Sequence, residues 1–192
     1  MIGVVLAGGA GQRLGTGSKA AVELAGRPLI SYPLAALAPV CESVAVVCKP
    51  DTELPDVRPA ERWDEPAEPR HPLAGIVHAL ERAGEPVLVC AADMPFVTAD
   101  ACQTLIRSGR AIAAVAIAGG VLQPVLGVYA PDALETMRAA AADAPLTATV
   151  EALDPVRVAL APALVASVNT PEELAAAEAA LAASASGSGP PR

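Results

Sequence analysis

The sequence predicts a single α/β domain with a mainly parallel sheet, because buried-strand patterns alternate with helical patterns along the chain. Three apolar runs rich in β-branched residues have the length of buried strands, at 2–7, 43–49 and 86–92. A chain of 192 residues can bury one full hydrophobic core. We therefore expect one domain over 1–183 and a flexible Gly/Ser/Pro-rich tail over 184–192.

The N-terminal half supplies most of the expected parallel sheet. Its periodicity predicts, in chain order, a strand at 2–7, a helix at 28–39, a strand at 43–49, a helix at 73–83 and a strand at 86–92. Pro33 falls near the start of the first helix, where proline is tolerated. The segment 50–72 is rich in proline and charge, and we expect a loop around a short piece near 60–63.

The C-terminal half predicts a hairpin between helices. Thr98 is expected to cap a helix that ends near Arg107. Strands at 111–118 and 122–130 would then be joined by a tight turn at Gly119-Gly120. Two further helix starts, at Pro131 and in the capping box Thr170-Pro171-Glu172-Glu173, follow from proline at the first helical position. The stretch 145–165 shows no clear pattern.

Composition excludes several classes of function. The net charge is −8 and aromatic residues make up 2% of the chain, so a nucleic-acid partner is not expected. No apolar run is long enough to span a membrane and no signal peptide is visible, which favours a cytoplasmic protein without a membrane partner. Four cysteines without a C-x-x-C pair argue against zinc and suggest buried thiols. We expect a monomer.

The glycine-rich stretch 6–19, LAGGAGQRLGTGSK, follows the first strand and fits neither common phosphate-binding template. The dinucleotide fingerprint needs a third glycine where Leu14 stands, and Lys19 lacks the flanking glycine and hydroxyl of a P-loop. Glycines nevertheless let backbone amides approach phosphate, and Arg13 and Lys19 add charge that suits a triphosphate. The alternative is a turn with two solvated basic residues.

Two further polar residues stand at ends of predicted elements. Asp93 follows the strand at 86–92, where a carboxylate could hold Mg²⁺ beside phosphates or simply close a turn. Asn169 precedes the capped C-terminal helix, and its amide oxygen could be a metal ligand or purely structural. Ligands of open α/β sheets bind at the carboxyl ends of the strands, where these residues are expected. We expect His71 in a loop and His78 on a helix face, without catalytic roles.

These segments together resemble a known family. LAGGAGQRLG with its lysine, then DMPF, then VNTPEEL resemble the nucleotidyltransferase family that includes molybdenum cofactor guanylyltransferase. Asp64 stands eight residues before Pro72 of PLAG, and Gln123-Pro124 precedes LGVY, as in that family. The resemblance implies a Rossmann-like three-layer sandwich. It also implies a Mg²⁺-dependent reaction in which a terminal phosphate of molybdopterin attacks the α-phosphorus of GTP and pyrophosphate leaves.

The resemblance also implies roles for individual residues. Those expected to bind the nucleotide are Leu6, Ala7, Gly8, Gly9, Lys19, Asp64 and Asp93. Arg13 and Lys19 would balance charge during transfer, Asp93 would ligate Mg²⁺, and Asn169 would complete the metal or acceptor site.

The sequence leaves alternatives to this assignment. Val47 and Ser167 stand where the family has asparagines, which leaves open CTP or another nucleotide and a different phosphorylated acceptor. A nucleotide-dependent oxidoreductase is disfavoured because Lys49-Pro50, not an acidic residue, closes the second strand. A non-catalytic nucleotide-binding domain is also possible, although the chain retains both Lys19 and Asp93.

Overall fold

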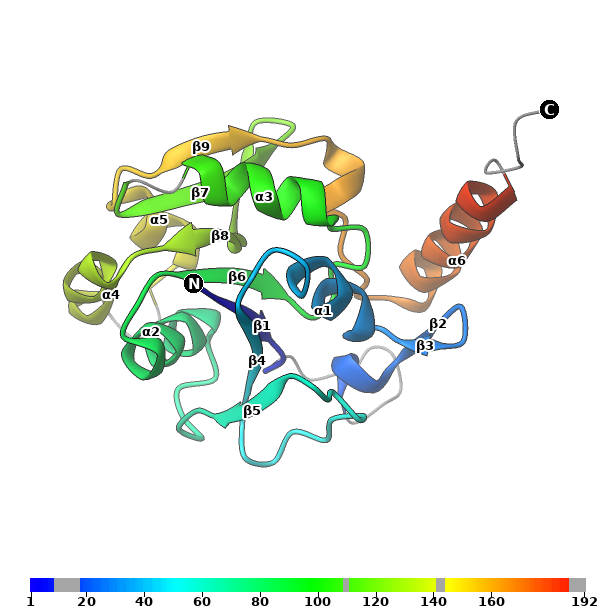
Figure 1. Cartoon of the computed structure of the whole chain (residues 1–192), viewed down its shortest axis with the longest axis horizontal. Helices are drawn as coiled ribbons and strands as arrows, with labels where there is room; N and C mark the ends of the chain where they lie inside the picture. The colour runs from blue at the N-terminus through cyan, green and yellow to red at the C-terminus, as the bar shows by residue number, and fades with distance from the viewer. Residues whose placement is uncertain (9–17, 109–110, 141–143, 187–192) are drawn as a thin grey trace.

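The computed structural model describes residues 1–8, 18–108, 111–140 and 144–186 (Figure 1). In these ranges the main sheet has seven strands, in the spatial order β5-β4-β1-β6-β8-β7-β9. Their bounds are β1 Ile2–Leu6, β4 Ser43–Cys48, β5 Glu61–Asp64, β6 Val87–Ala91, β7 Ala113–Ala118, β8 Val121–Tyr129 and β9 Val156–Ala159. A small antiparallel pair is formed by β2 Glu23–Leu24 and β3 Arg27–Pro28.

Strand directions confirm the predicted mainly parallel sheet with an antiparallel hairpin. The strands β5, β4, β1 and β6 run parallel to their neighbours. Strand β8 is antiparallel to both β6 and β7, and β9 returns parallel to β7. The turn between β7 and β8 is made by Gly119 and Gly120, whose φ angles of 56° and 81° carry no steric cost in glycine.

Helices cover both faces of the sheet, as the sequence predicts. The described helices are α1 Ser31–Leu37, α2 Pro72–Ala83, α3 Ala99–Ser108, α4 Leu134–Ala139, α5 Leu146–Glu151 and α6 Pro171–Ser186, with short 3₁₀ turns η2 Lys19–Ala21, η3 Pro131–Ala133 and η4 Pro162–Val165. One apolar core contains buried residues of α1 and α3, and a second contains those of α2, α4 and α5. Figure 1 shows α2 and α4 on one side of the molecule and α6 at its opposite end.

Capping side chains start two of the helices that border the site. His71 caps α2, because its Nδ1 accepts a hydrogen bond from Leu73 N at 3.3 Å. The predicted capping box begins α6: Glu173 N donates to Thr170 Oγ1 and Thr170 N donates to Glu173 Oε2, both at 3.2 Å. Reciprocal bonds of this kind satisfy backbone donors that the helix itself leaves free.

The structure differs from the sequence prediction in three segments. The expected loop 50–72 contains a paired edge strand, β5, because Trp63 packs into the core while β5 pairs with β4. The unassigned stretch 145–165 holds α5, β9 and η4. The helix expected at 28–39 is shorter, since Pro28 belongs to β3 and helical structure begins at Ser31.

The last described helix, α6, ends at Ser186, and residues 187–192 of the predicted tail lie outside the described part of the chain. Among the described helices, none has the length and apolar character needed to cross a bilayer.

Candidate functional site

A cavity of about 450 Å³ opens where the parallel strands end. The residues directly after four neighbouring strands line it: Ala7 and Gly8 after β1, Lys49 after β4, Glu65 after β5, and Ala92 and Asp93 after β6. Parallel strands deliver their carboxyl ends to one edge of a sheet, so segments far apart in sequence meet there. The cavity therefore lies where the fold class predicts a ligand site.

Three residues selected from the sequence converge at one side of this cavity. Lys19 Nζ donates to Asp93 Oδ2 at 2.9 Å and also to Asn169 Oδ1. The Lys19 and Asp93 side chains are 18% and 19% exposed, so their charges are only partly screened by water. The structure thus brings together η2, the turn after β6 and the segment before α6.

Backbone bonds hold Asn169 in this position. Val168 N donates to the carbonyl oxygen of Asp93 at 2.9 Å, which ties the segment before α6 to the turn after β6. Asn169 N donates to Glu173 Oε2 at 2.6 Å, so the capping box of α6 also fixes Asn169. The amide side chain is thereby left to face Lys19.

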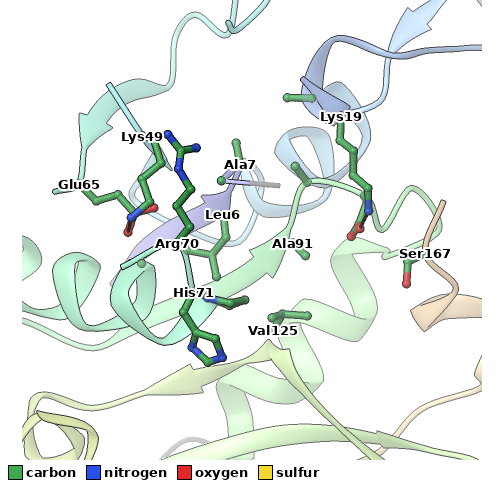
Figure 2. Close-up of a pocket in the computed structure, with 16 residues that line it drawn as sticks. Leu6, Ala7, Lys19, Lys49, Glu65, Arg70, His71, Ala91, Val125 and Ser167 are labelled. Atoms are coloured by element: carbon green, nitrogen blue, oxygen red, sulfur yellow. Dashed lines mark hydrogen bonds and ion pairs between the residues drawn. The ribbon is translucent and has the colours of Figure 1, made fainter. Parts of the chain in front are cut away.

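A second polar cluster lies at the other side of the cavity. Lys49 and Glu65 are 1% and 5% exposed, and Lys49 Nζ lies 3.3 Å from Glu65 Oε2. Lys49 Nζ also donates to the carbonyl oxygens of Pro66 and Pro69, each at 2.7 Å. Burial raises the pKa of Glu65, while the charges of Lys49 and Arg70 oppose that shift. Figure 2 shows Lys49 and Glu65 pointing toward each other, across Leu6 and Ala7 from Lys19.

The sequence pattern alone does not reveal this second cluster. Lys49 only closes the second predicted strand, and Glu65 lies within the segment 50–72, which is predicted to be a loop. The sequence does contain one sign of the cluster, because a charged residue directly follows each of the two strands: Lys49 follows β4 and Glu65 follows β5. The sequence pattern does not predict β5, so this sign is not visible from the sequence alone. His71 and Arg70 also line the cavity, so His71 is a capping residue that faces the site.

The remaining predicted site residues occupy varied positions. Leu6, Ala7 and Gly8 line the cavity, as expected for a nucleotide pocket. Asp64, at the end of β5, is exposed and accepts a bond from Arg62 Nε at 2.8 Å, and it does not line the cavity that the described residues form. Gly9 and Arg13 lie outside the described residues.

Three cationic side chains line the cavity among the described residues, namely Lys19, Lys49 and Arg70. Each lies against a carboxylate, that of Asp93, Glu65 or Asp51 respectively. The thiol of Cys48, at the end of β4, is a poor nucleophile because burial raises its pKa to about 11. The arrangement suits the binding of an anionic ligand rather than covalent catalysis by the protein.

The donor set on the Lys19 side is also compatible with a metal ion. The oxygens of Asp93 and Asn169 both accept from one ammonium group, so they already converge on a cation. Among the described residues no group of three or more His, Cys, Asp or Glu side chains could hold a metal. One carboxylate and one amide match Mg²⁺, which fills its remaining positions with water and substrate oxygens.

Comparisons with known proteins identify the family to which the chain belongs. Residues 3–158 match the family model of the MobA-like NTP transferase domain. A molybdenum cofactor guanylyltransferase of Cereibacter sphaeroides is 36% identical over 139 residues, covering 67% of this chain and 68% of the relative. A protein of Natronomonas pharaonis named "probable molybdenum cofactor guanylyltransferase" is 31% identical over 191 residues, covering 90% and 94%.

A solved structure shows the same fold over nearly the whole chain. The molybdopterin-guanine dinucleotide biosynthesis protein A of Archaeoglobus fulgidus is 25% identical, with a TM-score of 0.77, covering 95% of this chain and 100% of that one. The family match, the relatives and the shared fold lead to one conclusion: this chain is a nucleotidyltransferase that belongs to the MobA-like NTP transferase family.

Proposed function

We propose that this protein transfers GMP from GTP to the terminal phosphate of molybdopterin and releases pyrophosphate. The convergence of Lys19, Asp93 and Asn169 at the carboxyl edge of the sheet is the observation that carries the proposal. The names of the relatives from Cereibacter sphaeroides and Natronomonas pharaonis supply the base and the acceptor. No membrane or nucleic-acid partner is needed for this reaction between small molecules, which suits a cytoplasmic monomer.

The chemistry needs charge neutralisation rather than a strong base. An oxygen of the acceptor phosphate forms a bond to the α-phosphorus of GTP, and the bond from that phosphorus to the α–β bridging oxygen breaks. The attacking group is already an anion, so it has no proton to lose. The barrier comes from bringing two polyanions together, and positioned cations lower it.

The residues of the cavity suit these tasks. We assign to Lys19 the contact with the triphosphate and the leaving pyrophosphate, which it would make by leaving Asp93. Backbone groups of Leu6, Ala7 and Gly8 would hold the nucleoside. Arg13 and Gly9 keep their expected roles in charge balance and nucleotide binding. Asp64 keeps its proposed role in binding the nucleoside. Its exposed side chain does not favour that role, because it does not line the cavity formed by the described residues.

Asp93 and Asn169 would hold a divalent cation. Mg²⁺ is the cation that we propose, because it prefers oxygen ligands such as these. When bound, it would neutralise charge on the phosphates. Asp93 is the residue on which this part of the proposal depends most.

Pyrophosphate release is the direct test of the proposed reaction. The protein is incubated with Mg²⁺, molybdopterin and each of GTP, CTP, ATP and UTP in turn. We expect release with GTP that requires the acceptor. Release with CTP in place of GTP would move the protein to cytidylyl transfer, and no release with any nucleotide would contradict the proposal.

A pair of matched variants tests the role of Asp93. Asp93→Asn removes one charge at the proposed metal site and should lower turnover by at least roughly 100-fold. Asp132→Asn makes the same change at an exposed position on η3, away from the cavity, and should leave turnover unchanged. Thermal unfolding of both variants shows whether they are folded. A fully active Asp93→Asn variant would remove Asp93 from the mechanism.

A further inference from the structure

His71 presents an unused hydrogen-bond donor at the cavity. Its Nδ1 accepts a hydrogen bond from Leu73 N at 3.3 Å and so caps α2. A neutral imidazole has one protonated nitrogen, so a ring whose Nδ1 accepts carries its hydrogen on Nε2. Within the described part of the chain, Nε2 has no hydrogen-bond partner and is not among the buried atoms. The cap therefore fixes the tautomer and leaves Nε2–H available to a ligand.

His71 and its neighbour Arg70 both line the cavity but have different surroundings. Figure 2 shows their side chains extending in opposite directions from the loop before α2. Arg70 Nη2 donates to Asp51 Oδ2 at 2.6 Å, and Arg70 Nε lies 3.6 Å from Glu68 Oε1. Carboxylates of the loop thus engage the charge of Arg70, whereas the structure pairs the His71 ring with no carboxylate of a described residue.

Much of the remaining cavity wall is apolar. It includes residues from two strands and from the first turn of α2, namely Leu6, Ala7, Val125, Pro72 and Gly75. Ligand pockets commonly hold a flat, apolar body against such walls and orient it with a few polar groups. Figure 2 shows Lys19 and His71 at opposite sides of the cavity. With the phosphates of a nucleoside triphosphate at Lys19, the base would lie toward His71.

A neutral donor suits an uncharged acceptor better than it suits a phosphate, which binds charged donors more strongly. Nucleobases offer uncharged acceptors on their edges. Guanine has two of them side by side, O6 and N7. Adenine has an amino group in place of O6, and this second donor would oppose Nε2–H. The chemistry of His71 therefore matches the O6–N7 edge of guanine.

We propose that His71 Nε2–H donates a hydrogen bond to the O6–N7 edge of guanine and so contributes to selection of the base. This inference rests on the proposed function, because it assumes that the nucleoside triphosphate binds in this cavity with its phosphates at Lys19. It gives a binding role to a residue that neither the sequence motifs nor the family resemblance assigns to the site.

Two variants separate the cap of α2 from the contact with the base. His71→Asn keeps an acceptor near the position of Nδ1, and asparagine caps helices well, but its side chain ends before the position of Nε2. His71→Gln reaches that position with an amide donor but lacks the capping acceptor. In urea, His71→Asn should unfold at a midpoint close to that of the unmodified protein, and His71→Gln at a lower one.

Equilibrium binding is measured with GTP, with the triphosphate of 2-aminopurine riboside, which lacks O6, and with 7-deaza-GTP, which lacks N7. A neutral hydrogen bond changes affinity by roughly 2–13-fold. The unmodified protein should prefer GTP to at least one analogue, and His71→Asn should reduce that preference by roughly this factor. The affinity of His71→Asn for that analogue should hardly change. His71→Gln should keep most of the preference for GTP despite its lower stability.

Four outcomes would overturn the inference. In the first, His71→Asn keeps the full preference for GTP over both analogues. In the second, it weakens binding of GTP and of both analogues by the same factor, which would be a general effect on the loop. In the third, His71→Gln loses the preference as completely as His71→Asn, which would assign the effect to the ring and not to its donor. In the fourth, the unmodified protein binds CTP but not GTP, which would overturn the proposed base as well. Failure of the proposed function is recognised separately, as absence of GTP-dependent pyrophosphate release by the unmodified protein.

Discussion

Replacing Lys49 by methionine isolates the energetic role of the buried ion pair. Methionine has a similar length, so Lys49→Met removes the charge and the donors while largely preserving packing. The change leaves the Glu65 carboxylate buried without its counterion. Breaking a buried pair by removing one partner costs about 3–5 kcal/mol. The change also removes the donors to the partly buried carbonyl oxygens of Pro66 and Pro69, which adds to the cost.

The predicted loss has a characteristic pH dependence. Burial already raises the pKa of Glu65 above its ordinary value of 4.5, and Lys49→Met removes the largest opposing influence, so the pKa rises further. A carboxyl group whose pKa is raised in the folded state loses stability as the pH rises from the unfolded pKa through the folded one. The deficit of Lys49→Met should therefore be small near about pH 4 and complete near about pH 8.

Urea unfolding at several pH values measures this effect. For a chain of this size the loss corresponds to a fall in Tm of roughly 6–20 °C. The double variant Lys49→Met/Glu65→Gln carries no buried charge at this pair and should recover most of the loss. Arg138→Met breaks the exposed Arg138–Glu81 pair and should cost less than about 1 kcal/mol. A loss for Lys49→Met below about 1 kcal/mol at every pH, or a double variant no more stable than the single one, would refute the reasoning.

Two other changes test the opposite side of the cavity. Lys19→Ala should weaken nucleoside triphosphate binding by roughly 10–150-fold, because a charged donor is lost, and Lys19→Arg should restore part of it; unchanged affinity in a binding titration would count against the phosphate contact. Thr170→Ala removes the capping bond to Glu173 N and should lower the free energy of unfolding by about 1 kcal/mol in urea, whereas an unaltered midpoint would show that the cap contributes nothing.

The sequence predicted most of the sheet because burial leaves a strong local pattern. Strands β1, β4 and β6 are continuous apolar runs, and Gly119-Gly120 identifies the hairpin turn. Strand β5 was missed because three of its four residues are charged. It is a strand through pairing with β4 and burial of Trp63, and neither is visible in its own composition.

The candidate site was predictable to a similar extent. Lys19, Asp93 and Asn169 stood in recognisable motifs at ends of predicted elements, and the structure brings them together. Lys49 and Glu65 could not be paired from sequence, because their contact depends on β4 and β5 being neighbours. Because β5 is not evident from the sequence, the buried Lys49–Glu65 pair is not evident either.

The scarcity of lysine makes this protein suited to chemical footprinting. Both lysines of the chain, Lys19 and Lys49, line the cavity, and the side chain of Lys49 is buried. An amine-directed reagent can therefore react with the α-amino group of Met1, which pairs with Glu42 and Glu85, and with Lys19. Protection of Lys19 from acylation, normalised to Met1, reports occupancy of the cavity directly, without an acceptor substrate and without turnover.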